Sequence, residues 1–448
     1  MQKKVNNLYN YLKSWESNGS YKSMIVHRGN LKRVSNLHDT PWLQGPMIES
    51  LLEIYMGMKT EENLKDLIKA VEVQLGNLTE IGSYKNAGHE DDRFSSLIHN
   101  GLASIALAKV LINIDSEVTE EFQGSIKATI NRNMEYLTEK LFSEEEKSFK
   151  FDLLDFYTHD NNHFVLNMNA IILEFIVLYE LIFDKNMDYY AFSIIDFLDK
   201  HIVSEFIPYS NLRKDIQITI YSAIIGRGLV EYIIHKEGKI PESKKVIVIN
   251  LLNKVNASIE DSLYKNMYFI HGKKVSNTEV YDEQFPVFIS GSGIILDYLW
   301  RFQSYQPGKG LNIKELAENV LKHQNKNGGV KNYKGYYTKD NYRKINVKSV
   351  WEDNVPTPGW NGFLLLSLLK IFKNDLDFAE IKKESLKKTV ILNYKFLCFE
   401  GEKIFILLSW FPLLSMAFYI FEKKKDKPIF CWDFRYVIKL FKKGYYIN

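Results

Sequence analysis

The sequence has 448 residues, of which 46% are hydrophobic and 25% are charged, a balance typical of a globular protein rather than a disordered one. Its formal net charge is +3, which is close to zero for this length. A broad positive field of the kind that attracts nucleic acid is therefore excluded.

The N-terminus is polar and lacks the apolar stretch of a signal peptide. The chain has two cysteines, Cys398 and Cys431, too few for a disulfide framework. Both features favour a soluble, cytoplasmic protein.

Helical periodicity dominates the chain and follows a recurring unit. Each unit has a polar loop rich in His, Asp, Asn and Trp, then a strongly apolar helix, and usually a more amphipathic helix. The polar loops are 38–46, 88–93, 158–163, 208–215, 281–286 and 351–362. The apolar helices are predicted at Met47 to Met58, at Phe94 to about Ile112, in stretches ending near Phe183, His235 and Phe302, and at Phe363 to Phe372. Amphipathic partners are predicted at Glu61 to Leu75, Thr119 to Leu141 and Lys244 to Leu263.

This alternation predicts an all-α fold with two concentric layers of helices. A helix of an inner layer is buried on nearly all sides, whereas a helix of an outer layer buries a single stripe. The irregular spacing of the units argues against a consensus solenoid. We therefore predict a closed double ring of helical hairpins, an (α/α)6 toroid, with an open superhelix as the structural alternative.

In such a ring the inner helices run in the same direction, so the polar loops meet at one end. The helix N-termini there present free N–H groups and positive dipole ends, which favour carboxylate or phosphate groups. Each polar residue alone can also be explained as a helix N-cap. Residues 89–93 and 159–163 exceed that explanation, because capping does not require histidines beside several carboxylates.

Metal binding is not expected. His159 and His163 have the spacing of one helical turn, but no second pair of residues has the strict spacing of a zinc site. No cofactor is expected either. The turn at Gly328 and Gly329 resembles Gln-x-x-x-Gly-Gly turns of prenyltransferase and squalene-cyclase repeats, and also fits a structural helix C-cap.

Near the C-terminus, residues 404–421 are uncharged and largely apolar. We predict a buried closing helix here, which would complete a toroid domain of residues 1–422, followed by a basic, aromatic tail of residues 423–448. The alternatives are a membrane-spanning helix and a peripheral membrane contact through the C-terminal region.

The six-unit pattern resembles the six-hairpin α/α toroids, which include polysaccharide lyases, unsaturated glycuronyl hydrolases, sugar epimerases and other glycosidases. Residues 161–167, Asn-Asn-His-Phe-Val-Leu-Asn, resemble the Asn-His segment of heparinase II/III-type and alginate-lyase-type toroids. The resemblance implies that Asn162 neutralises a uronate carboxylate. It also implies that His163 transfers a proton together with a tyrosine, for which Tyr209, Tyr281 and Tyr337 are candidates.

The chain lacks the β-sandwich domain that usually follows the toroid in those lyases, which fits an enzyme that acts on short oligosaccharides. We therefore predict a lyase or hydrolase for an acidic oligosaccharide. One alternative is a terpene-cyclase-like enzyme, which would share the helical ring and an aromatic interior, although His-Glu-Asp-Asp at 89–92 only approaches the Asp-x-Asp-Asp motif of such enzymes. The other alternative is a non-catalytic scaffold. The predicted catalytic residues are His89, Asp91, Asp92, Asn162, His163, Tyr281 and Asp353. The predicted substrate-binding residues are Trp42, Arg93, Arg213, Trp351, Trp360 and Asn361.

Overall fold

The computed structural model describes residues 1–23, 37–38, 41–85, 95–153, 163–274, 287–334 and 356–381, and the strands 396–400, 403–409, 416–422 and 428–431. All structural statements below refer to these residues.

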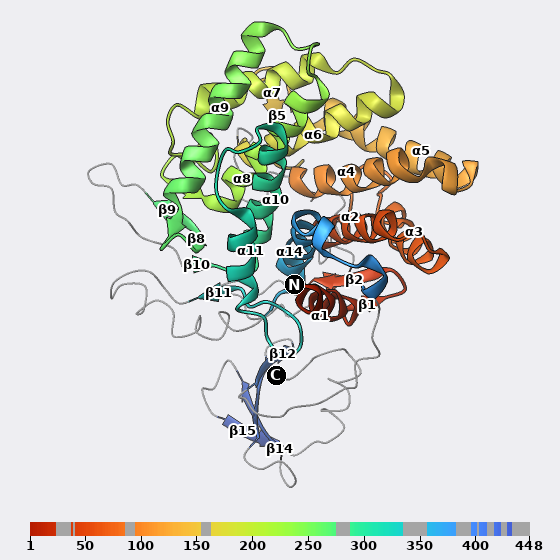
Figure 1. Cartoon of the computed structure of the whole chain (residues 1–448), viewed down its shortest axis with the longest axis vertical. Helices are drawn as coiled ribbons and strands as arrows, with labels where there is room; N and C mark the ends of the chain where they lie inside the picture. The colour runs from red at the N-terminus through yellow and green to blue at the C-terminus, as the bar shows by residue number, and fades with distance from the viewer. Residues whose placement is uncertain are drawn as a thin grey trace.

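An inner ring of helices forms the centre of the molecule (Figure 1). Each helix packs against the next, and the last packs against the first, so the ring is closed. The apolar helices predicted from the sequence are therefore confirmed, and the open superhelix is excluded. The inner ring consists of α2 (Pro41–Gly57), α4 (Leu97–Ile114), α6 (Leu166–Phe183), α8 (Thr219–His235), α10 (Ser292–Tyr305) and α14 (Pro358–Ile371).

Outer helices cover this ring, and each inner helix packs against the outer helix that follows it in the chain. The last inner helix, α14, packs instead against α1 at the N-terminus, so the first helix of the chain completes the outer layer. This arrangement is the predicted (α/α)6 toroid. The outer helices are α1 (Gln2–Lys13), α3 (Glu61–Gly76), α5 (Glu120–Tyr136), α7 (Asp188–His201), α9 (Glu242–Asp261) and α11 (Ile313–Leu321).

Burial explains why the two layers differ in composition. In α6 every residue from Leu166 to Tyr179 is buried, because other helices surround it. In α5 the buried residues fall on one stripe that includes Ile126, Ile130 and Met134. An outer helix therefore tolerates charged residues over most of its circumference, whereas an inner helix does not.

The connections are strongly unequal at the two ends of the ring. From an inner to an outer helix the chain needs only residues 58–60, 115–119 or 184–187, whereas the return from an outer to an inner helix takes residues 14–40, 137–165 or 262–291. All long connections therefore lie at the N-terminal end of the inner helices. This end is called the mouth below.

Short antiparallel strands stiffen the mouth, and several of them join neighbouring connections. Within single connections, β1 pairs with β2, β2 with β3, β4 with β5, and β7 with β8. β8 also pairs with β10 of the same connection, whereas β6 with β9 and β10 with β11 join two different connections. The strands are β1 (Glu16–Ser17), β2 (Ser20–Ser23), β3 (Leu37–His38), β4 (Phe142–Ser143), β5 (Ser148–Phe149), β6 (Ile216–Ile218), β7 (Leu263–Tyr264), β8 (Tyr268–Ile270), β9 (Gly272–Lys274), β10 (Val287–Phe288) and β11 (Tyr333–Lys334).

Buried amide side chains clamp the mouth connections to the first turns of inner helices. Asn169 of α6 accepts a hydrogen bond from the N–H of Phe149 at 2.7 Å and donates one to the Phe149 carbonyl at 3.0 Å. Asn361 of α14 makes the same two bonds with Val330, at 2.7 and 2.9 Å. Buried backbone groups require such partners, so these clamps hold the connections in place. Gln44 of α2 and Asn100 of α4 bind backbone groups in the same way.

The segment 404–421 is not the helix predicted from its apolar length. It contributes β13 (Lys403–Ser409) and β14 (Met416–Glu422) to an antiparallel sheet with β12 (Phe396–Glu400) and β15 (Pro428–Cys431). Apolar length alone does not separate a helix from strands, and Ile and Phe favour strands. Strand β15 lies in the predicted tail and pairs with β14, so this sheet crosses the predicted boundary at residue 422.

Among the described helices, α4 and α6 are long and apolar enough to cross a membrane, with 72% and 78% of the apolar window buried inside the molecule. Both belong to the inner ring. Their apolarity is therefore explained by their position in the core.

Candidate functional site

A row of rings at the mouth centres on His163. This residue lies in the extended segment just before α6, and its side chain is only 5% exposed. Its ring stacks on Phe151, with centroids 6.0 Å apart and an interplanar angle of 13°. The ring of Tyr209 lies 6.1 Å from it on another side, and Tyr221 lies 5.6 Å beyond Tyr209. We call these four residues the His163 row.

Backbone contacts fix the His163 row by joining the third and fourth mouth connections. The N–H of Leu166 donates to the carbonyl of Tyr209 at 3.4 Å, and the N–H of Asn211 donates to the carbonyl of Phe164 at 3.1 Å. The side chain of Asn211 accepts a third bond from the N–H of Phe164 at 2.9 Å. The pairing of His163 with Tyr209 therefore does not depend on side-chain packing alone.

A second group of rings lies at the starts of α10 and α14. His271 stacks on Phe288 at 4.9 Å with an interplanar angle of 15°, and Trp360 meets Phe288 edge-on at 4.9 Å. Trp360 is half-buried in the first turn of α14. The predicted substrate-binding residue Trp360 thus lies at the mouth.

The other described site predictions have different surroundings. Arg213 is exposed on the fourth mouth connection and pairs with Asp215 at 3.2 Å. Asn361 is fully buried, and its carboxamide is bonded to backbone in the clamp described above. Trp42 lies in the first turn of α2, and its side chain falls outside the described part. His89, Asp91, Asp92, Arg93, Asn162, Tyr281, Trp351 and Asp353 also lie outside the described residues.

His99 is a mouth residue that the sequence did not single out. It is half-buried in the first turn of α4, and its Nδ1 has no hydrogen-bond partner among the described residues. Burial lowers the pKa of His99 to about 4, so the imidazole is neutral near pH 7. A neutral ring can accept a proton or a hydrogen bond. The signal in the sequence was its position, directly after a polar loop.

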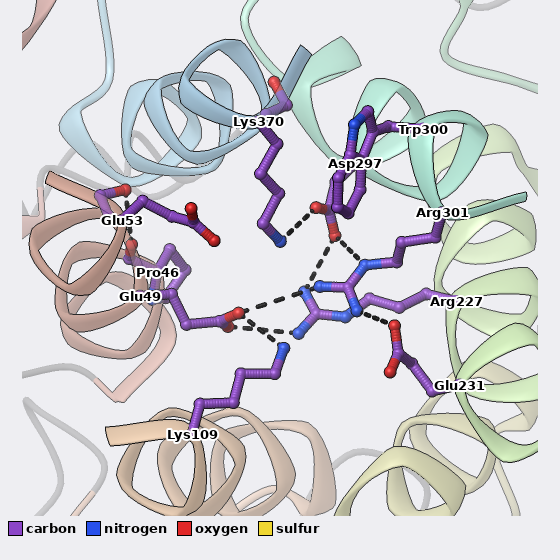
Figure 2. A network of polar contacts seen from close by, with 12 residues as sticks. Pro46, Glu49, Glu53, Lys109, Arg227, Glu231, Asp297, Trp300, Arg301 and Lys370 are labelled. Atoms are coloured by element: carbon purple, nitrogen blue, oxygen red, sulfur yellow. Dashed lines mark hydrogen bonds and ion pairs between the residues drawn. The ribbon is translucent and has the colours of Figure 1, made fainter. Parts of the chain in front are cut away.

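A cluster of charged side chains fills the middle of the inner ring (Figure 2). Every inner helix contributes to it, and none of these side chains is more than 17% exposed. The cluster was not predicted from the sequence. In the described part of the chain, its members are Glu49, Lys109, Glu174, Arg227, Glu231, Asp297, Arg301 and Lys370.

Glu174 of α6 has several cationic partners in this cluster. It accepts hydrogen bonds from Arg227 at 2.5 and 3.0 Å and from Lys109 at 2.6 Å. On the opposite side, Asp297 accepts bonds from Arg301 at 2.9 Å and Lys370 at 2.8 Å. Carboxylates and cations are equal in number among these cluster members, so charge is balanced where water is scarce.

The charges change each other's proton affinity. Burial by itself would raise the pKa of Glu49 and Glu174, but the cations around them outweigh burial and hold the pKa of each below its ordinary value. Burial likewise opposes the charge of Arg227, yet Glu174 and Glu49 raise its pKa. Lys370 differs, because burial and Arg301 together lower its pKa.

Buried apolar side chains lie between the charged cluster and the mouth on several inner helices. Positions one or two turns nearer the mouth on the same helix faces are occupied by Leu102 above Lys109, Ile171 above Glu174 and Leu366 above Lys370, all at most 2% exposed. The cluster is therefore part of the core. The mouth, with its half-buried rings, is the candidate functional site.

Comparisons with known proteins bear on the fold. Neither a family model nor a curated protein sequence matches the chain. Among solved structures, an unsaturated glucuronyl hydrolase specific for heparin has a TM-score of 0.57 at 8% identity, covering 83% of this chain and 97% of its own. A D-mannose isomerase has a TM-score of 0.57 at 9% identity, covering 82% and 96%. An α-mannanase of Bacteroides thetaiotaomicron has a TM-score of 0.55 at 10% identity, covering 83% and 96%.

These proteins are similar to this chain over most of its length and nearly all of theirs. At such low identities, the similarity establishes the fold and not the reaction. The chain thus has the architecture of the (α/α)6 toroids to which its repeating pattern was similar.

The charged cluster gives a stability prediction. Glu174→Gln keeps the shape of the side chain but removes its charge, which leaves Arg227 and Lys109 undercompensated in the core. We expect a loss of about 3–5 kcal/mol in the free energy of unfolding, measured with urea. Lys314→Gln, which breaks the exposed pair of Lys314 with Asp375, is the control and should cost a small fraction of that. A loss below about 1 kcal/mol for Glu174→Gln would contradict a major contribution of the cluster to the stability of the fold.

His99 gives a pH prediction. Its pKa is about 4 when folded, below the ordinary value of 6.5, so between these two pH values the unfolded chain binds more protons than the folded one. Stability should therefore fall as pH drops from 6.5 to 4, with His99 contributing at most roughly 3 kcal/mol. His99→Gln should lose this part of the pH dependence. Parallel stability curves for the two proteins would show that His99 is not held neutral.

Proposed function

We propose that this chain is a carbohydrate-active enzyme that acts on an oligosaccharide at the mouth of the ring. The observation that carries the proposal is the pairing of His163 with Tyr209, fixed by backbone contacts between two mouth connections. A histidine and a tyrosine side by side supply two groups that can transfer protons. Support also comes from the similar structures, whose names describe enzymes that act on sugars.

The rings around this pair suit a sugar. Tyr221 and Trp360 are half-buried at the starts of α8 and α14, so part of each ring remains open to solvent. Aromatic faces stack on the apolar face of a pyranose, and the polar edges of the sugar need nearby donors and acceptors. The combination favours a saccharide over an extended hydrocarbon, and so disfavours the terpene-cyclase alternative.

We further propose that the saccharide is acidic. The N-termini of the inner helices converge at the mouth, and their N–H groups and dipoles favour an anion. Arg213 adds a cationic side chain there, although Asp215 shares its charge. In a lyase, His163 and Tyr209 would remove the proton next to a uronate carboxylate and protonate the leaving oxygen. In a hydrolase, the predicted acids Asp91, Asp92 and Asp353 would supply the carboxylates.

The reaction type is tested by incubating the protein with acidic and neutral oligosaccharides. A rise in ultraviolet absorbance reports a new double bond and a lyase, whereas new reducing ends without that rise report a hydrolase. Isomerised sugar without bond cleavage would indicate an isomerase or epimerase. Absence of any conversion or binding across the panel would contradict the proposal and favour a scaffold.

The roles of the pair are tested by His163→Ala and Tyr209→Phe. We expect each to lower kcat by about 100-fold or more, because each removes a proton-transfer group, with little change in KM. His235→Ala, at the opposite end of α8, is the matched control and should retain activity. Wild-type kcat in both mouth variants would place the chemistry elsewhere.

A further inference from the structure

Asn167 faces the axis of the ring, just inside the mouth. It is the second residue of α6 and lies seven residues before Glu174, which reaches into the central cluster. Seven residues are close to two full turns, so the two side chains share one face of the helix. Asn167 therefore lies about 10 Å nearer the mouth than Glu174. It follows His163 by four residues in the chain.

The side-chain oxygen of Asn167 is buried without a hydrogen bond. The residue is 2% exposed, and its Oδ1 has no hydrogen-bond partner in the described structure. Asn169, two residues along and on the opposite face, bonds both backbone groups of Phe149 and the carbonyl of Val165. The same side chain is thus fully bonded where it clamps a loop and unbonded where it faces the axis.

An unbonded amide in the core is costly. Leaving a buried acceptor unsatisfied costs about 1–3 kcal/mol, so native proteins seldom keep one without a use for it. An apolar residue of similar size at position 167 would avoid this cost, as Ile171 does one turn deeper. The position is therefore better explained by a partner that arrives with a ligand.

We propose that the Asn167 carboxamide binds a hydroxyl group of the saccharide that reaches His163, which rests on the function proposed above. A hydroxyl both donates and accepts hydrogen bonds, and so it matches the oxygen and the nitrogen of a carboxamide. Ile98 of α4 and Ile220 of α8 are likewise the second residues of their helices, and both are apolar and buried. The contact thus suits a neutral hydroxyl rather than a carboxylate, which the helix N-termini and Arg213 hold further out.

The test compares Asn167→Leu with the matched variant Asn169→Leu, in the full chain. Asn167→Leu removes an unsatisfied amide, so its Tm should equal or exceed that of the wild type. Asn169→Leu leaves the backbone groups of Phe149 unbonded, so its Tm should fall by about 2 °C or more. An equal drop in both variants would show that Asn167 is a structural residue and would overturn the inference.

The second part of the test uses the oligosaccharide that the wild type converts, together with analogues that each lack one hydroxyl. Asn167→Leu should lower kcat/KM by about 10- to 100-fold on the parent, and by less than about twofold on the one analogue that lacks the contacted hydroxyl. Asn169→Leu, assayed well below its Tm, should keep the wild-type order of preference among the analogues.

The possible failures are distinguishable. If the wild type itself converts no saccharide, the proposed function fails and this inference fails with it. If the wild type is active and Asn167→Leu has the same kcat/KM and the same preferences, only the hydroxyl contact is overturned.

Discussion

Inner helices that run in the same direction around one axis bring their N-termini to a single end of the ring. The packing of α14 against α2 closes the ring and so fixes this order of the helices. The consequences extend through the molecule. Short connections suffice at one end, while the other end must carry the chain back from the outer layer, so the long connections and their small strands gather there. Segments as distant as residues 151 and 360 thereby reach the same mouth.

The centre of the ring holds the buried cluster of charged side chains. Charged side chains from every inner helix meet there and neutralise one another, because an isolated charge at that depth would be very costly. Such a cluster specifies which helices are neighbours, since Glu174 can be paired only when α4 and α8 flank α6. Toward the mouth, buried apolar side chains such as Leu102 and Leu366 precede the charged residues on the same helices. The toroid therefore has a centre filled by charged side chains and a mouth at which aromatic side chains such as Tyr221 and Trp360 are half-buried.

Local sequence patterns were enough to locate the inner helices, since a helix buried on all sides is apolar throughout, as α6 is. The resemblance to known toroids supplied Tyr209 as one of three partners for His163. Patterns that depend on distant contacts were not accessible. Glu49 and Arg227 are 178 residues apart in the chain, and the local sequence around neither residue predicts their ion pair. Likewise, the sequence did not show that the Asn361 side chain bonds the backbone of a mouth connection whereas the Asn167 side chain faces the axis, because both are asparagines near the start of an inner helix. The helix predicted for the apolar run at 404–421 was wrong, because the length and composition of this run fit a pair of strands as well as a helix.

A structure of the protein with a bound oligosaccharide tests the central claim most directly. The account predicts sugar density at the mouth, against His163 and Tyr209 and within hydrogen-bonding distance of Asn167, with the charged cluster below unchanged from the unbound protein. Sugar bound at the opposite end of the ring, beyond the C-termini of the inner helices, would contradict it.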